Sequence, residues 1–382
     1  MGLDVTPFTV AIPQSALDDL HDRLTRTRFP EQIAGAGWDY GTELGYEREL
    51  VEYWRDTYDW RAQEARLNAF DHFTATVDGQ NVHFVHQRSP EPDALPLIIT
   101  HGWPGSIVEF LDVIGPLTDP RAHGGDPADA FHVVAPSIPG YAFSGPTTER
   151  GWDPERVARA WATLMAGLGY ERYGAQGGDW GAIITTHLGR VDPAHLAGIH
   201  LNMVIAGRPP DGDAEPLTER EQQGLADMGA YMETDAGYMQ IQSTKPQTLG
   251  YALEDSPAGL AAWIVEKFRS WSDCDGDVES AFTRDQLLTN VMLYWLTGTA
   301  HSSARLYYEN RRAGNFATGG RVDVPTGAAI FPREIMRPPR RWAEQRFNIT
   351  RWTEFDRGGH FAAMEQPALF VDDVRAFFRT VR

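Results

Sequence analysis

The pentapeptide Gly177-Gly178-Asp179-Trp180-Gly181 constrains the fold of this 382-residue chain more than any other segment. Its spacing is that of a nucleophile elbow, G-x-nucleophile-x-G, which is a sharp turn between a strand and a helix. The segment follows a predicted strand over 173–176 and precedes a predicted helix over 182–189, as the motif requires. Glycines suit this turn because the nucleophile has a strained backbone and residues without a Cβ avoid a clash beside it. The sequence therefore predicts a turn that presents the Asp179 side chain at the end of a strand.

The nucleophile position holds Asp, where an ester hydrolase holds Ser. A carboxyl group with an ordinary pKa of about 3.9 is charged at neutral pH, so an Asp nucleophile needs no base to deprotonate it. Attack by a carboxylate on an sp³ carbon forms an alkyl ester on the enzyme, which water must then hydrolyse. The change from Ser to Asp indicates strained or activated alkyl electrophiles, namely epoxides or alkyl halides.

Strand-like and helix-like segments divide the chain into four parts. Residues 1–75 contain short helical stretches interrupted by prolines, which predicts a meander that packs on the rest of the molecule. Residues 76–205 alternate between strands and helices, and this pattern predicts an α/β fold with a mostly parallel, doubly wound sheet. Residues 206–320 lack the alternation, and 321–382 resume it. We therefore expect a mainly helical cap at 206–320, inserted between the two halves of one sheet.

The predicted elements of the sheet follow from short apolar runs and from alternation. The predicted strands cover 82–86, 95–100, 131–138, 173–176, 196–203, 327–331 and 349–355. A helix over 154–168 and a closing helix over 361–379 complete the pattern.

Charge and cysteine content exclude several classes of partner. The net charge is −19, from 34 basic and 53 acidic residues, which argues against a nucleic-acid or anionic-membrane partner. Cys274 is the only cysteine, so no intrachain disulfide can form and a thiolate metal cluster is excluded. The chain has no run of about 18 apolar residues and no secretory signal pattern. We expect a cytoplasmic protein without a membrane partner, a metal or an organic cofactor.

A nucleophile elbow implies an acid and a histidine later in the chain, in that order. His360 lies in a loop after the last predicted strand, and Gly358-Gly359 before it can bring the imidazole close to the elbow. The acid should follow the penultimate strand, where Glu334 lies just beyond 328–332. Its role would be to hold the tautomer of His360 and to stabilise the imidazolium. The competing carboxylates in this region are Asp323, Glu354 and Asp356.

Two backbone N–H groups are candidates for an oxyanion hole. One belongs to Trp180, the residue after the nucleophile. The other belongs to Trp103 in the segment His101-Gly102-Trp103-Pro104-Gly105-Ser106, since Pro104 has no N–H group. They would act when water activated by His360 attacks the carboxyl carbon of Asp179.

An epoxide oxygen leaves as an alkoxide, and a phenol with a pKa near 10 can donate a hydrogen bond to it without ionising first. The cap supplies six candidates, although each is also explained as a packed aromatic residue: Tyr231, Tyr238, Tyr251, Tyr294, Tyr307 and Tyr308. Four further aromatic residues of the cap could line a pocket for a bulky or aryl epoxide: Trp263, Trp271, Tyr294 and Trp295. The same residues would equally suit the core of the cap.

Together these segments resemble the epoxide hydrolases of the microsomal type, within the α/β-hydrolase fold, over nearly the whole chain. The resemblance rests on Pro7-Phe8 and on segments 70–87, 101–106, 136–144, 177–181 and 358–362. It implies a small-molecule epoxide as substrate, a covalent ester on Asp179 and no cofactor. The absence of a membrane anchor implies a soluble member of the bacterial kind, and a homodimer is compatible with these features.

The resemblance also selects among the tyrosines. Segment 237–246 is similar to the first cap-tyrosine segment of the family, which implies Tyr238 as a donor to the epoxide oxygen, and 302–310 is similar to the second, which implies Tyr307. Tyr308 adjoins Tyr307 and remains an alternative. The resemblance supports Glu334 as the acid. The substrate pocket is expected to contain Trp103, Trp180, Tyr238, Tyr307 and Phe361.

Two other functions fit part of the pattern. A haloalkane dehalogenase also uses Asp-Trp at the elbow, and the indole N–H of Trp180 would then bind the departing halide, but the paired cap tyrosines have no part in that reaction. A non-catalytic binding protein of the same fold is the second alternative, but such proteins usually lose part of the triad.

Overall fold

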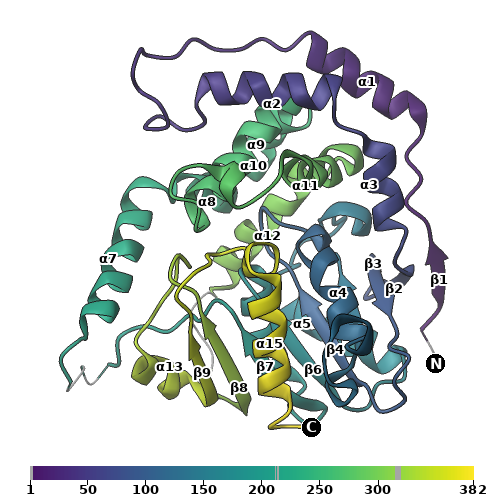
Figure 1. Cartoon of the computed structure of the whole chain (residues 1–382), viewed down its shortest axis with the longest axis vertical. Coiled ribbons are helices and arrows are strands. Elements are labelled where there is room, and N and C mark those ends of the chain that lie inside the picture. The colour runs from purple at the N-terminus through teal and green to yellow at the C-terminus, as the bar shows by residue number, and fades with distance from the viewer. Residues whose placement is uncertain (1–2, 211, 213–214, 315–319) are drawn as a thin grey trace.

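A nine-stranded sheet forms the centre of the protein, as the computed structural model in Figure 1 shows. The structure describes residues 3–210, 212, 215–314 and 320–382. The strand order is β1-β2-β3-β5-β4-β6-β7-β8-β9, and the strands from β5 to β9 in this order are parallel. The strands are β1 (Val5–Phe8), β2 (His72–Val77), β3 (Gln80–Gln87), β4 (Leu95–Thr100), β5 (Phe131–Pro136), β6 (Tyr173–Gly177), β7 (Leu196–Leu201), β8 (Val322–Ile330) and β9 (Phe347–Glu354).

The predicted α/β fold is confirmed, and each predicted strand lies within two residues of an observed strand boundary except at the start of β8, which begins earlier. Strand β4 lies inside the sheet between β5 and β6, and its apolar run is fully buried at Leu97, Ile98 and Ile99. A strand with apolar residues on both faces needs cover on both sides, which parallel sheets receive from their connecting helices.

Strands β1 and β2 were not predicted from the sequence. They pair antiparallel with each other, and β2 forms a hairpin with β3 in which Val77 lies opposite Gln80. The turn residues Asp78 and Gly79 both have positive φ, +49° and +75°. An Asp-Gly pair in a two-residue hairpin loop adopts this conformation readily, and it is the local signal for the hairpin. The N-terminal part thus contributes strands to one edge of the sheet as well as helices. The boundary that we expected at residue 75 falls inside strand β2.

Helices cover the sheet in layers. Helices α4 (Leu111–Thr118) and α15 (Pro367–Phe378) pack together on the face seen in Figure 1, and α5 (Pro154–Gly167) packs against α6 (Trp180–Val191) in the other layer. The predicted closing helix is in fact two helices, α14 (Ala362–Glu365) and α15, because Pro367 disfavours helical geometry at Gln366. The remaining short helices of this part are α13 (Arg340–Arg346), η1 (Ile107–Phe110), η2 (Arg121–His123), η3 (Pro127–Asp129) and η4 (Ala142–Ser144).

A group of helices between β7 and β8 lies mainly above one end of the sheet, with its first helix set to one side, and the N-terminal helices lie across the group (Figure 1). The group consists of α7 (Glu219–Thr234), α8 (Gly237–Thr244), α9 (Pro246–Leu253), α10 (Pro257–Trp271), η5 (Val278–Ser280), α11 (Arg284–Thr297) and α12 (Ala300–Ala313). The N-terminal helices are α1 (Gln14–Thr25), α2 (Leu44–Asp56) and α3 (Trp60–Leu67). Helices α1 and α2 both contact α10. In the part of the chain that the structure describes, no helix has the length and apolar character needed to cross a membrane.

Candidate active site

Asp179 lies in the turn between β6 and α6 and has an unusual backbone conformation, with φ +49° and ψ −127°. Left-handed φ values are rare for residues with a side chain and are retained where the surroundings enforce them. The adjacent glycines show what enforces this one. A Cβ on Gly181 would lie 1.9 Å from the carbonyl oxygen of Thr100, and a Cβ on Gly177 would lie 2.1 Å from that of Gly181. The helix can therefore approach the strands closely only with glycines at these two positions.

Three side chains from the carboxyl ends of parallel strands meet at this turn. Asp179 follows β6, Glu334 follows β8 and His360 follows β9. Nε2 of His360 lies 3.4 Å from Oδ2 of Asp179, and Nδ1 of His360 lies 2.8 Å from Oε1 of Glu334. Carboxyl ends of parallel strands share one edge of a sheet, so residues distant in sequence converge there.

The imidazole of His360 is buried between two carboxylates. Burial by itself lowers its pKa, but the charges and hydrogen bonds of Glu334 and Asp179 outweigh burial and raise the pKa of His360 well above its ordinary value. This setting therefore favours the imidazolium form of His360 in the resting protein.

The structure separates Glu334 from the three competing carboxylates. Glu334 is 2% exposed and contacts His360, whereas the Asp323 side chain is 85% exposed beside Arg321. The other two competitors, Glu354 and Asp356, are also exposed.

The backbone N–H of Trp103 donates a hydrogen bond of 2.8 Å to Oδ1 of Asp179. The loop that carries this N–H group is fastened by helix α11. The Asn290 side chain donates to the carbonyl oxygen of Pro104 at 2.7 Å, and the Tyr294 hydroxyl donates to that of Gly105 at 2.6 Å. Trp180, the other predicted donor, is the first residue of α6 and directly follows the nucleophile.

Three of the six candidate tyrosines line the same cavity as Asp179, and two of them, Tyr238 and Tyr307, are buried. The ring of Tyr238 stacks on that of Trp103, with centroids 4.9 Å apart, and the ring of Tyr307 meets that of Trp180 edge-on at 4.7 Å. Burial, reinforced by neighbouring tyrosines and by Asp179, raises the pKa of both phenols well above the ordinary value. Both hydroxyls therefore remain protonated and can donate.

Tyr251 and Tyr308 lie outside this cavity, whereas Tyr231 lines it and is half-buried. The Tyr308 hydroxyl accepts a hydrogen bond from Arg312 on the exposed side of α12, and Tyr251 is exposed. Tyr231 has its hydroxyl 2.8 Å from that of Tyr238, a contact that the sequence did not indicate. The spacing of Tyr231 and Tyr238 spans the end of α7 and the start of α8, so helical periodicity gives no signal for this pair.

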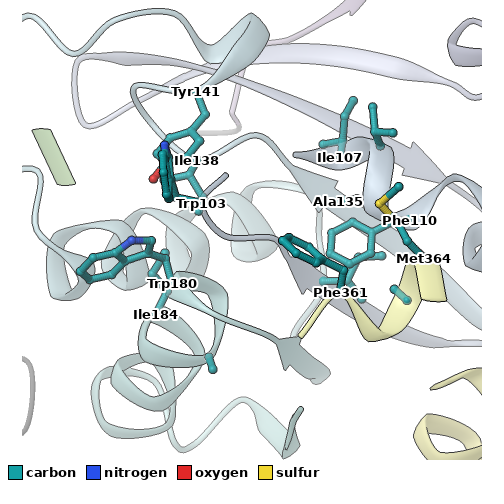
Figure 2. Close-up of a cluster of buried hydrophobic side chains, with 14 of the residues drawn as sticks. Trp103, Ile107, Phe110, Ala135, Ile138, Tyr141, Trp180, Ile184, Phe361 and Met364 are labelled. Atoms are coloured by element: carbon teal, nitrogen blue, oxygen red, sulfur yellow. The ribbon is translucent and has the colours of Figure 1, made fainter. Parts of the chain in front are cut away.

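A mostly apolar cavity of about 680 Å³ opens above Asp179. Trp180, Tyr238 and Tyr307 line it, as predicted for a substrate pocket. Its other apolar side chains include five methionines: Met203, Met228, Met232, Met239 and Met336. The two remaining residues predicted for the pocket, Trp103 and Phe361, border a different, small cavity beside Asp179. Figure 2 shows Phe361 packed with Phe110 and Met364, away from Trp180.

The aromatic residues that could have formed the pocket lie elsewhere. Trp263 and Trp271 line a second, more polar cavity of about 930 Å³, together with the buried Lys267, and this cavity shares Tyr238 with the apolar one. The hydroxyl group of Tyr294 donates its hydrogen bond to the carbonyl oxygen of Gly105, and the ring of Trp295 lies beneath the guanidinium of Arg23. Tyr294 and Trp295 thus belong to the cap packing, Trp271 borders the ring of His360, and methionines form much of the apolar cavity wall.

Lys267 and Asp235 contact the aromatic residues Tyr238 and Trp271 beside the site, and no sequence motif indicates these two charged residues. The Lys267 ammonium lies 2.8 Å from Asp235 and 5.0 Å from the ring centre of Tyr238. The second oxygen of Asp235 accepts a hydrogen bond of 2.8 Å from the indole of Trp271. Among the described residues, no group of three His, Cys, Asp or Glu side chains is placed to hold a metal ion.

Comparison with known proteins identifies the family. Residues 5–110 match the model of the epoxide hydrolase N terminus, and 96–244 match that of the alpha/beta hydrolase fold. The chain is 53% identical to the "Putative epoxide hydrolase" of Stigmatella aurantiaca over 99% of this chain and 86% of the relative. It is 38% identical to epoxide hydrolase 1 of Sus scrofa over 98% and 88%.

Solved structures agree with the sequence relatives. The Aspergillus niger epoxide hydrolase superimposes with a TM-score of 0.90 at 32% identity, covering 100% of this chain and 97% of the other. The juvenile hormone epoxide hydrolase of Bombyx mori gives a TM-score of 0.89 at 31% identity, covering 99% and 95%. The chain belongs to the epoxide hydrolase family, with its characteristic N-terminal region on an α/β-hydrolase fold.

Proposed function

We propose that this protein adds water to an epoxide in two steps and releases a vicinal diol. The observation that carries the proposal is the placement of the Asp179 carboxylate. Oδ1 accepts the Trp103 N–H, Oδ2 faces His360, and the group lies at the base of an apolar cavity that also contains two buried phenols.

In the first step, Oδ2 of Asp179 attacks a ring carbon and the carbon–oxygen bond of the epoxide breaks. Hydroxyl groups of Tyr238 and Tyr307 donate to the departing oxygen, and one of them gives it a proton. The product is a hydroxyalkyl ester on Asp179. Both phenols lie in a buried setting, where a hydrogen bond to a developing alkoxide is stronger than in water.

Before the second step, His360 passes its proton to the tyrosinate. The neutral imidazole then removes a proton from water, and the resulting hydroxide attacks Cγ of Asp179. Oδ1 becomes the oxyanion, and the N–H groups of Trp103 and Trp180 stabilise it. The bond between Cγ and Oδ2 then breaks, so Oδ2 leaves with the diol, and the leaving oxygen takes the proton from His360. Glu334 orients the imidazole and stabilises its charged form. Transfer of the remaining proton from Asp179 to His360 restores the carboxylate and the imidazolium of the resting state.

The methionine-rich cavity supports a bulky, lipophilic epoxide as the substrate. Methionine side chains are flexible and polarisable, so they adapt to apolar groups of varied shape. A cytoplasmic location and a homodimeric state remain predictions.

A single-turnover reaction in water labelled with heavy oxygen tests the mechanism, with styrene oxide and longer alkyl and aryl epoxides as substrates. With enzyme in excess, we expect unlabelled diol and heavy oxygen in the peptide that contains Asp179. Asp179→Asn should abolish turnover, and His360→Gln should trap the ester as added mass. Normal turnover by Asp179→Ala would refute the mechanism.

The same assay discriminates the dehalogenase alternative. The Trp180 ring packs against Tyr307, and the cap places two phenols over Asp179, an arrangement suited to a leaving oxygen. Halide release from chlorinated or brominated alkanes, without diol formation from epoxides, would reverse this assignment.

A further inference from the structure

The small cavity beside Asp179 contains an ionisable side chain that the two-step mechanism does not use. The cavity leaves about 10 Å³ for the centre of a water molecule, which is room for one water. Asp179, His360 and Glu109 all line it. A single water here would touch the ester-bearing residue, the proposed base and a second carboxyl group.

The loop that supplies the oxyanion donor also holds Glu109. Glu109 lies in η1, directly after the loop, and its carboxyl group folds back over Gly105, where an added Cβ would lie 1.7 Å from Oε1. The backbone N–H groups of Gly102 and Ser106 hydrogen-bond to this carboxyl group. The position of Glu109 is thus fixed by the same loop that Asn290 and Tyr294 fasten to the cap.

We propose that the carboxyl group of Glu109 positions the water that hydrolyses the ester on Asp179. This inference rests on the ester mechanism proposed above. One O–H of the water donates to Nε2 of His360, which takes that proton as the new bond to Cγ of Asp179 forms. The other O–H donates to an oxygen of Glu109, so a lone pair of the water is directed at Cγ. Fixing a reactant in this way is worth up to about a hundredfold in rate.

The protonation state of the Glu109 carboxyl group affects how readily His360 can act as the base. Burial raises the pKa of Glu109 to about 8, so the group is mostly neutral at pH 7. The ionisable groups that face it are His360, Asp179 and Tyr294. A second carboxylate at this place would hold a larger share of His360 as the imidazolium, which cannot take a proton from water. Ester hydrolysis should therefore fall as the pH rises through the pKa of Glu109.

Rapid-mixing kinetics with mass detection of the ester test this role, because they measure ester formation and ester hydrolysis separately. In Glu109→Ala we expect hydrolysis to slow about tenfold or more while formation stays within about threefold, so ester accumulates in the steady state. Glu109→Gln retains a neutral acceptor. It should hydrolyse the ester within about threefold of the wild-type rate at pH 7 and should lose the decline at alkaline pH.

Gly105→Ala provides a matched variant that keeps Glu109 but displaces its carboxyl group. It should show the same slow hydrolysis, and the double variant Gly105→Ala/Glu109→Ala should be no slower than Glu109→Ala alone, because both changes remove one interaction. Wild-type hydrolysis by Glu109→Ala, or an alkaline decline that persists in Glu109→Gln, would overturn the inference. Failure of His360→Gln to accumulate any ester would instead overturn the covalent mechanism itself.

Discussion

Nε2 of His360 lies 3.4 Å from Oδ2 of Asp179, so the proposed base of the second step is paired with the nucleophile of the first. While Asp179 is charged, the pair favours the imidazolium form of His360. Ester formation would remove the charge of Asp179, and the pKa of His360 would fall. The base would thus become available only after the intermediate exists.

Asp179→Asn mimics this loss of charge, and we expect it to lower the pKa of His360. The histidine should titrate at a lower pH in the variant than in the wild type, since one of its two stabilising carboxylates is gone. NMR titration of nitrogen-labelled histidines measures this shift. His195, which is paired with Asp192 on the surface, serves as the internal reference and should not move. An unchanged His360 titration would contradict the coupling.

Glu334→Gln should act on the second step alone. It removes the charge that stabilises the His360 imidazolium, so ester hydrolysis should fall between about a hundredfold and ten-thousandfold while ester formation changes little. Mass detection of accumulated ester tests this result. The control is Glu354→Gln, which alters an exposed carboxylate beside Arg220 and should leave both steps unchanged. Equal slowing of both steps by Glu334→Gln would assign Glu334 a structural role.

Tyr238→Phe and Tyr307→Phe should act on the first step. Each removes one donor to the departing oxygen, and ester formation should slow about tenfold to a thousandfold, with a larger effect in the double variant. Tyr308→Phe is the matched control, because its hydroxyl contacts Arg312 and points away from the site. Stopped-flow measurement of ester formation distinguishes these outcomes, and a large effect of Tyr308→Phe alone would reassign the second donor.

Met239→Trp should narrow the apolar cavity. We expect kcat/KM to fall about tenfold or more for epoxides with long alkyl chains and to stay nearly unchanged for small ones, because a bulky ring excludes volume that only the longer substrates need. Ile241→Trp, on the same helix but exposed and outside the cavity lining, is the control. Equal effects on long and short substrates would show that the cavity does not select for chain length.

Asp373 should make the stability of the fold depend on acid pH. Despite its burial, which acts in the opposite direction, hydrogen bonds and charge from His200, Thr353 and Arg351 lower the pKa of Asp373 to about 2. Because the folded pKa is below the unfolded value of about 3.9, the stabilisation is present above pH 4 and is lost as the pH falls toward 2. Asp373→Asn should lower the free energy of unfolding by about 2 kcal/mol at pH 7.

Urea denaturation at several pH values tests this prediction. The difference between Asp373→Asn and the wild type should shrink below pH 4, whereas Asp372→Asn, at an exposed position one residue earlier, should behave as the wild type at every pH. A difference that is constant from pH 7 to pH 3 would show that the effect does not come from the carboxylate charge.

Local sequence determined the elements and the position of the nucleophile. The apolar run of β4 and the glycines around Asp179 act between near neighbours in the chain, so strand, turn and helix could be predicted there. Glu334 and His360 could be predicted from their positions after the last two strands, because parallel strands bring their carboxyl ends to one edge. The Asp78-Gly79 hairpin signal was present too, beside the predicted strand over 82–86, but β2 before it was assigned to the N-terminal meander.

Only the tertiary structure decided what surrounds the nucleophile. Tyr307 and Tyr308 are neighbours in sequence, but consecutive residues of a helix point about 100° apart, so packing of α12 decides which phenol faces Asp179. The methionines of the cavity come from distant segments, and the carboxyl group of Glu109 reaches the site by folding over Gly105. Local preferences act between residues close in the chain, whereas burial, cavity shape and the partner of a side chain depend on segments that meet only when the chain has folded.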